Sequence, residues 1–176
     1  MLSEASKYRL VWADPSYRVK CHSLDLWNLL RGESTPKNPI DLGCGTGRLV
    51  KAWREEGIEG VGIDIAPNAP DPDLPEDWFT ISPLQSLTGC YDLGVCADVL
   101  EHIPPEEVDV VVERICACCD ELWMKIAYFN SQLRGLDLHL TMKPSEWWVK
   151  IFEQWGKVEQ VPFETHKKEF ILRWRQ

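Results

Sequence analysis

The stretch IDLGCGTGRLV, residues 40–50, joins a short apolar run to a helix-like run through a glycine-rich turn. Its glycines stand at alternate positions from Gly43, whereas a dinucleotide-binding fingerprint needs a glycine at position 48, where the chain has Arg48. A glycine-rich turn after a strand lets a ligand approach the backbone closely. Asp41 would repel a diphosphate but suits a cationic amino group. The stretch therefore favours a small ligand over a nicotinamide dinucleotide.

Strand and helix patterns alternate along the rest of the chain. Short apolar runs predict strands over residues 38–43, 58–64, 78–82, 91–97, 121–129, 157–164 and 168–175, and amphipathic runs predict helices over 22–32, 47–57, 104–119 and 145–156. Prolines at positions 67, 70, 72 and 75 exclude a helix between the second and third strands. We expect an α/β fold with a doubly wound, mostly parallel seven-stranded sheet, an antiparallel C-terminal strand pair and one crossover helix missing.

The length and composition indicate a single domain over residues 1–176. A chain of this size buries one proper core but not two. The N-terminal residues lack an apolar signal region, and no apolar run is long enough to span a membrane. We therefore expect a cytoplasmic monomer or homodimer with no membrane partner. Cys116 to Cys119 contain a C-x-x-C pair, but no second pair stands at zinc-site spacing, so we favour small buried side chains over a metal or redox role.

The charge pattern argues against a nucleic-acid surface. The net charge is −9, and the basic residues gather in the two ends of the chain while the middle is strongly acidic. A polyanion would meet repulsion over most of such a surface. A small molecule or a nucleotide is the easier partner.

Three motifs in order resemble the class I S-adenosylmethionine-dependent methyltransferases. The first is the acid and glycine-rich turn quoted above, the second is VGIDIA at residues 61–66, and the third is YDLGVCADVLEHIPPEE at residues 91–107. The third is similar to the small-molecule O-methyltransferase branch of the family. The resemblance extends from about Asn38 to the carboxyl end and implies a Rossmann-like cofactor-binding core over residues 38–176. Residues 1–37 are then an N-terminal turn and helix, with a lid as one possible role.

The resemblance also implies which residues bind S-adenosylmethionine. Asp41 would bind its amino group directly or through water, and the backbone of Gly43, Cys44 and Gly45 would approach its methionine part. Asp64 would hold the ribose, Ile65 would lie against the adenine, and Ala97 and Val99 would flank the sulfonium. The chain departs from the family after the third strand, where an acid usually meets the adenine amine. Here only Ser82, Leu84 and Gln85 are offered, so the sequence leaves adenine recognition open.

Candidate catalytic groups follow the fourth and fifth strands. Asp98 and His102 stand in the ADVLEH segment and His139 in the LDLHLTM segment, and any of them could act as the general base that a hydroxyl acceptor needs. For Glu101 and His102 we favour an orienting role at the helix start. An alternative comes from a resemblance to ubiquinone-biosynthesis O-methyltransferases, in which the spacing of Asp98, Glu101 and His102 would hold a divalent metal; the metal is not the favoured interpretation.

The N-terminal segment WADPSYRVK, residues 12–20, looks like the Asp-Pro-Pro-Tyr tetrapeptide of amino-group DNA methyltransferases. That tetrapeptide follows strand four in the DNA enzymes, whereas here ADVLEH takes that place. We therefore expect a turn before the first helix, with a lid formed by Trp12, Tyr17 or Arg18 as the alternative.

The sequence thus predicts methyl transfer from S-adenosylmethionine to a small-molecule acceptor, with oxygen slightly preferred over nitrogen. One alternative is methylation of a nucleotide or nucleic acid that contacts the basic termini. A second is a regulatory protein that binds S-adenosylmethionine without catalysis. The sequence does not name the acceptor.

Overall fold

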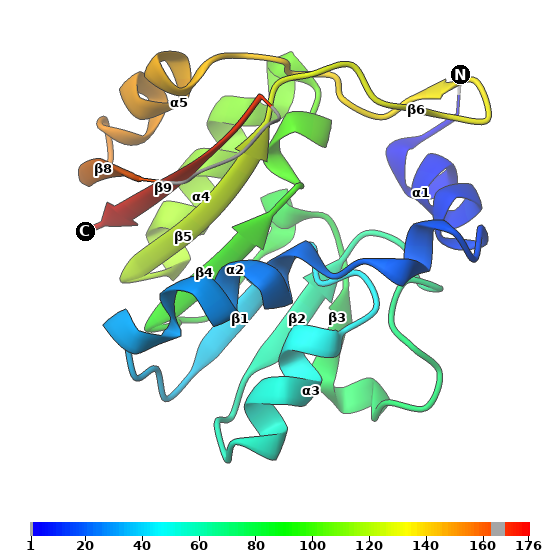
Figure 1. Ribbon diagram of the computed structural model, residues 1–176, viewed down its shortest axis with the longest axis horizontal. Coiled ribbons are helices and arrows are strands. Elements are labelled where there is room, and N and C mark those ends of the chain that lie inside the picture. The colour runs from blue at the N-terminus through cyan, green and yellow to red at the C-terminus, as the bar shows by residue number, and fades with distance from the viewer. Residues whose placement is uncertain (1, 163–167) are drawn as a thin grey trace.

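A computed structural model describes residues 2–162 and 168–176. The main sheet has seven strands in the order β3-β2-β1-β4-β5-β9-β8. Strands β1 to β5 pair in parallel, whereas β9 runs antiparallel to both β5 and β8 (Figure 1). This order confirms the predicted doubly wound sheet and its antiparallel C-terminal strand pair.

The elements follow the predicted runs closely from β1 onward. The strands are β1 Pro39–Leu42, β2 Val61–Asp64, β3 Phe79–Ile81, β4 Leu93–Ala97, β5 Glu121–Ala127, β6 Gln132–Leu133, β7 Leu136–Asp137, β8 Lys157–Val161 and β9 Glu169–Arg175. The α-helices are α1 Glu4–Trp12, α2 His22–Leu30, α3 Arg48–Glu55, α4 Val108–Cys118 and α5 Ser145–Phe152. Residues 163 and 164 of the predicted sixth strand, 157–164, lie outside the described residues.

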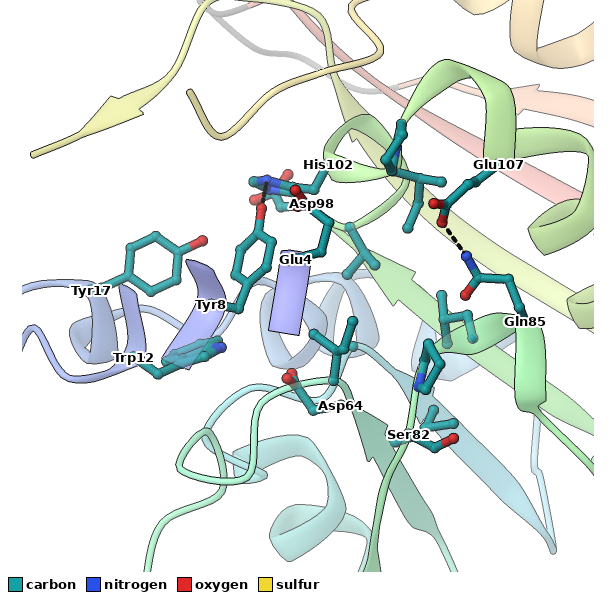
Figure 2. A pocket seen from close by; sticks show the side chains of 18 residues that line it. Glu4, Tyr8, Trp12, Tyr17, Asp64, Ser82, Gln85, Asp98, His102 and Glu107 are labelled. Atoms are coloured by element: carbon teal, nitrogen blue, oxygen red, sulfur yellow. Dashed lines mark hydrogen bonds between the residues drawn. The ribbon is translucent and has the colours of Figure 1, made fainter. Parts of the chain in front are cut away.

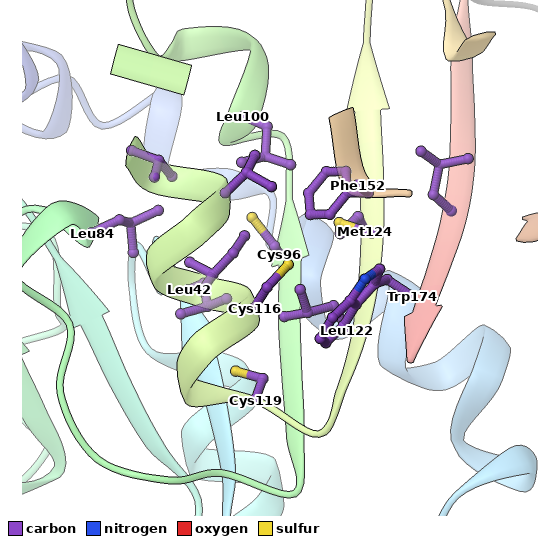
Figure 3. Packing of buried hydrophobic residues seen from close by; sticks show 14 of the residues in the cluster. Leu42, Leu84, Cys96, Leu100, Cys116, Cys119, Leu122, Met124, Phe152 and Trp174 are labelled. Carbon is purple, nitrogen blue, oxygen red and sulfur yellow. The ribbon is translucent and has the colours of Figure 1, made fainter. Parts of the chain in front are cut away.

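Two apolar cores lie on the two faces of the sheet. Helices α2 and α3 pack on one face around Trp27, Trp53 and Trp123. Helices α4 and α5 pack on the other, where Figure 3 shows Cys116 and Cys119 among buried apolar side chains. The two cysteines pack as small apolar side chains, as the sequence predicted.

The proline-rich crossover between β2 and β3 contains no α-helix, as predicted. Its described residues form only a short 3-10 turn, Glu76–Trp78, before β3 begins. Strand β3 forms one edge of the sheet, and Asp64 at the carboxyl end of β2 lines a pocket.

The N-terminal segment holds a helix that the sequence patterns missed. Helix α1 begins after Ser3, whose hydroxyl accepts a hydrogen bond from Ser6 N at 3.3 Å. The predicted turn follows α1: Asp14 Oδ1 accepts from Ser16 N at 3.0 Å and from Ser16 Oγ at 2.7 Å. None of the helices in the described part of the chain is both long and apolar enough to cross a membrane.

Candidate functional site

The glycine-rich turn after β1 has no room for a side chain at Gly43 or Gly45. Gly43 and Gly45 have φ angles of +77° and +52°, in the left-handed region that favours glycine. A Cβ on Gly43 would lie 2.4 Å from Val99 Cγ2, and one on Gly45 would lie 2.6 Å from Trp12 Cη2. The turn is anchored because Gly43 N donates to Ile63 O at 2.8 Å. Val99 and Trp12 therefore pack so closely on the turn, whose φ angles are positive, that both positions require glycine.

Asp64 ends β2 and holds the turn from the other side. One carboxylate oxygen accepts from Gly45 N at 3.0 Å, and the other accepts from Ala66 N at 2.9 Å. Burial nevertheless raises the pKa of Asp64 from 3.8 to about 6. Each oxygen keeps a free lone pair, so the carboxylate can still accept hydrogen bonds from two neighbouring hydroxyls.

Asp41 lies on β1 beneath the turn and is completely buried. Ser23 Oγ, from α2, donates to its Oδ2 at 3.0 Å, and Oδ1 has no partner among the described residues. Burial raises the pKa of this carboxyl from 3.8 to about 8. An unpartnered buried carboxylate oxygen indicates a place for a cationic ligand group or an ordered water.

Two pockets meet above the carboxyl ends of β1, β2 and β4. The first, here called the Asp64 pocket, includes Asp64, Ile65, Ser82, Gln85, Val99 and Glu107 in its lining (Figure 2). The second, here called the His139 pocket, includes His22, Ser23, Cys44, Ala97, Phe129 and His139. Both pockets are lined by Trp12, Tyr17, Gly43, Asp98 and His102.

The structure brings most of the predicted cofactor residues to these pockets. Gly43 lines both; Cys44, Gly45 and Ala97 line the His139 pocket; Asp64, Ile65 and Val99 line the Asp64 pocket. Asp41 is completely buried and lines neither pocket. Ser23, which donates a hydrogen bond to Asp41, does line the His139 pocket and so connects Asp41 to it.

Asp98 follows β4 in a strained backbone conformation, with φ of 55°. Its carboxylate lies 3.3 Å from Lys125 Nζ and 3.1 Å from His22 Nε2. Lys125 also lies 3.5 Å from the carboxylate of Glu169. Asp98 is therefore already paired with two nitrogen groups, which hold its carboxylate in place.

Glu101 and His102 connect separate segments. Glu101 is completely buried and accepts from Ala127 N at 2.9 Å, and burial raises its pKa well above the usual range. Nδ1 of His102 lies 2.6 Å from Tyr8 Oη and 3.0 Å from Leu138 O. Burial and the neighbouring His139 lower the pKa of His102 to about 3, so it stays neutral. These contacts support the predicted orienting role.

His139 lines the His139 pocket with one of its ring nitrogens already hydrogen-bonded. Its Nδ1 lies 2.6 Å from Phe129 O, and because a carbonyl only accepts, this nitrogen carries the proton. Burial lowers the pKa of His139, so the ring is neutral near pH 7 and Nε2 is left as an acceptor. The ring lines the second pocket and lies edge-on to His102 at 4.8 Å between ring centres.

Comparison with known proteins places this site in a family. A family model described as a methyltransferase domain matches residues 9–164 of the chain. The chain belongs to this methyltransferase family. Membership confirms the enzyme class that the three motifs predicted, an S-adenosylmethionine-dependent methyltransferase.

Named relatives of the methyltransferase cover only part of its length. A chloroplastic magnesium protoporphyrin IX methyltransferase from Arabidopsis thaliana is 32% identical over 93 residues, 46% of this chain and 29% of that protein. A ubiquinone biosynthesis O-methyltransferase from Bordetella avium is 27% identical over 124 residues, 60% of this chain and 50% of that protein. The matched regions span half or less of these two relatives.

Solved structures resemble the methyltransferase over nearly its whole length. Magnesium protoporphyrin IX methyltransferase from Synechocystis PCC 6803 with bound S-adenosylhomocysteine (SAH) has a TM-score of 0.65 at 18% identity and covers 100% of this chain and 89% of that chain. The 1,6-didemethyltoxoflavin-N1-methyltransferase of Burkholderia thailandensis has a TM-score of 0.64 at 20% identity and covers 98% and 83%. At these identities the likeness shows the fold.

The contacts of Asp98 differ from those that the metal alternative requires. Lys125 and His22 occupy the carboxylate of Asp98, so the predicted set of Asp98, Glu101 and His102 does not fit a metal ion. Among the described residues, one ligand atom each from Glu101, His102 and His139 lie within 4.8 Å of one another.

Sequence reasoning missed four residues of the methyltransferase site: Tyr8, His22, Ser23 and Lys125. Tyr8, His22 and Ser23 belong to the N-terminal helices, and their contacts with His102, Asp98 and Asp41 span 94, 76 and 18 positions. Lys125 lies inside a buried strand, where a charged residue is rarely found without a partner. That last signal alone was visible in the sequence.

Proposed function

We propose that this methyltransferase binds S-adenosylmethionine across both pockets and methylates a small-molecule acceptor, with a hydroxyl oxygen preferred over an amine nitrogen. The observation that carries the proposal is the wall that the two pockets share. Asp64, suited to two neighbouring ribose hydroxyls, lies on one side of this wall, and the neutral His139 lies on the other. The reacting centre then lies at the shared residues Asp98 and Gly43.

The residues present fit the cofactor. Gly43 lines both pockets and Gly45 lines the His139 pocket, where the methionine part would lie. The unpartnered oxygen of the buried Asp41 matches a cationic amino group, reached through Ser23 or a water molecule. The bound cofactor would supply a methyl group attached to a positively charged sulfonium sulfur. When the acceptor takes the methyl group, the rest of the cofactor is left as SAH, whose sulfur is a neutral thioether.

His139 is the residue that we assign to the proton. When a hydroxyl oxygen forms its new bond to carbon, its proton must leave, and Nε2 of His139 is free to accept it. Asp98, held by Lys125 and His22, orients the acceptor rather than removing its proton. Phe129 and Tyr17 supply aromatic surface in the same pocket.

The known relatives support a small acceptor. The Arabidopsis and Bordetella proteins are named for magnesium protoporphyrin IX and for ubiquinone biosynthesis, and the Burkholderia structure holds 1,6-didemethyltoxoflavin beside SAH. The net charge of −9 does not favour a nucleic acid.

The test is a turnover screen that measures SAH release from S-adenosylmethionine. Separate pools contain phenols and other hydroxy compounds, amines and heterocycles, nucleotides, and RNA or DNA. We expect turnover with a pool of small hydroxy compounds. Methylation of nucleic acid with steep salt dependence would favour the first alternative, and cofactor binding without turnover in any pool would favour the regulatory alternative.

A further inference from the structure

A pair of polar side chains closes the end of the Asp64 pocket that lies away from Trp12 and Tyr17 (Figure 2). Gln85 lies in the 3-10 turn Leu84–Ser86, and Glu107 is the N-cap residue of α4. Nε2 of Gln85 donates a hydrogen bond to Oε2 of Glu107. Both side chains are half-buried, and both line the pocket.

The carboxylate of Glu107 decides how the amide of Gln85 is turned. An ionised carboxylate only accepts hydrogen bonds, so the amide nitrogen of Gln85 must face Glu107. The amide oxygen of Gln85 must then point away from Glu107. The oxygen of Gln85 is left without a partner by this contact, and Nε2 keeps a second hydrogen. The pair therefore offers the pocket one fixed acceptor and one fixed donor.

The walls beside this pair suit a flat aromatic ring. Ile65, Val99 and Ile103 line the same pocket as Asp64 and the pair, and they give it apolar surface. An amide that offers an acceptor beside a donor matches the edge of adenine, whose amino group donates and whose neighbouring ring nitrogen accepts. A 6-oxo purine presents the opposite pattern, a carbonyl beside an N–H.

We propose that Gln85 recognises the adenine amino group of S-adenosylmethionine, and that Glu107 gives this recognition its specificity by preventing the amide from turning over. This inference rests on the cofactor part of the proposed function. It supplies the adenine contact that the sequence left open, because the family's acid after the third strand is missing here.

The experiment measures, by isothermal titration, the dissociation constants of SAH and of S-inosylhomocysteine, in which a carbonyl replaces the adenine amine. The variants are Gln85→Leu, which keeps the size but removes the amide, and Glu107→Gln, which can donate as well as accept. Glu106→Gln is the matched control, because Glu106 is exposed and does not line the pocket. Thermal melting checks that each variant folds.

We expect the unaltered protein and the Glu106→Gln control to bind SAH at least about tenfold more tightly than the inosyl analogue. Gln85→Leu should weaken SAH and bring the two constants within about threefold of each other. Glu107→Gln should keep most of the SAH affinity but bind the inosyl analogue more tightly, because the amide is then free to turn.

Equal affinities for the two ligands in the unaltered protein would overturn the proposal, as would full discrimination in a folded Gln85→Leu variant. Failure to bind SAH at all would instead overturn the cofactor part of the proposed function as well. The two failures are therefore distinguishable in the same titrations.

Discussion

Asp41 is wholly inside the protein, where burial raises the pKa of its carboxyl from 3.8 to about 8. A carboxyl with a higher pKa in the folded state than in the unfolded state binds its proton more tightly when folded. The free energy of unfolding therefore decreases as pH rises from the lower value to the higher one. At neutral pH Asp41 lowers the stability of the free protein, and a cationic ligand group would reverse this effect.

Asp41→Asn tests whether Asp41 lowers the stability of the free protein at neutral pH. Asparagine keeps an acceptor for Ser23 but cannot ionise, so we expect the variant to melt several degrees above the unaltered protein at pH 8 and at about the same temperature near pH 4. SAH affinity should fall in the same variant. Melting curves across this pH range measure the difference, and a difference that does not change with pH would contradict the assignment.

His139→Gln separates the two histidines of the site. Loss of the base should lower kcat by about 100-fold or more on a hydroxyl acceptor while SAH affinity stays unchanged. Because the pKa of His139 is lowered, activity of the unaltered enzyme should be lost only below about pH 6.5. His102→Gln should instead lower the melting temperature, because it removes the ring that joins Tyr8 to Leu138. Unchanged kcat in His139→Gln would remove His139 from the mechanism.

The sequence predicts those site residues that follow a strand within one motif. Asp64 is the last residue of β2, and Gly43 and Val99 stand one and two positions past the ends of β1 and β4; parallel strands bring such positions to one edge of the sheet. The pairing of Asp98 with Lys125 and His22 depends on two other segments. No local pattern encodes contacts of that range, so the structure was needed to find them.

At the scale of elements, α1 covers the site through a few specific contacts. Val11 is its buried apolar residue, whereas Leu10 is 53% exposed. Tyr8 reaches His102 at 2.6 Å, and Trp12 lies against Gly45. After the turn, Arg18 pairs with Asp71 at 2.5 Å. A helix attached by few contacts, with one buried apolar residue, is a candidate for local opening, which is the lid alternative for the N-terminal segment.

Trp12→Ala tests the lid, with Leu10→Ala as the matched control on the same helix. Trp12 lines both pockets, so its removal should weaken SAH binding about tenfold or more while the melting temperature of the free protein changes little. Leu10 is exposed and lines neither pocket, so its variant should bind normally. Equal effects of the two substitutions on SAH affinity would show that α1 has no role in the site.

Helix α1 also shows where sequence patterns fail at this scale. Helices α3 and α4 were predicted because their apolar residues recur on one face that packs on the sheet. The residues of α1 show no such stripe, because the helix lies over a site rather than over the core. Its hydrogen-bonded cap and its contacts with distant loops stabilise it instead.

At the scale of the whole molecule, the ligand site joins the N-terminal segment to both halves of the sheet. Residues that line the two pockets come from α1, α2 and the ends of β1, β2, β4 and β5. A ligand that contacts all of them stabilises the folded state as a unit, since none of these groups is assembled in the unfolded chain.

Thermal melting with SAH, S-adenosylmethionine or NAD tests this coupling. A ligand at about 100 times its dissociation constant adds roughly 2.7 kcal/mol of stability. For a chain of this size each 1 kcal/mol raises Tm by about 2–4 °C, so SAH should raise it by roughly 5–11 °C and NAD by nothing measurable. Because position 48 is arginine, a pyrophosphate does not meet the third glycine of the dinucleotide-binding fingerprint. A rise with NAD and none with SAH would contradict the ligand class, whereas a rise with SAH that vanishes in Trp12→Ala would link the lid to the cofactor.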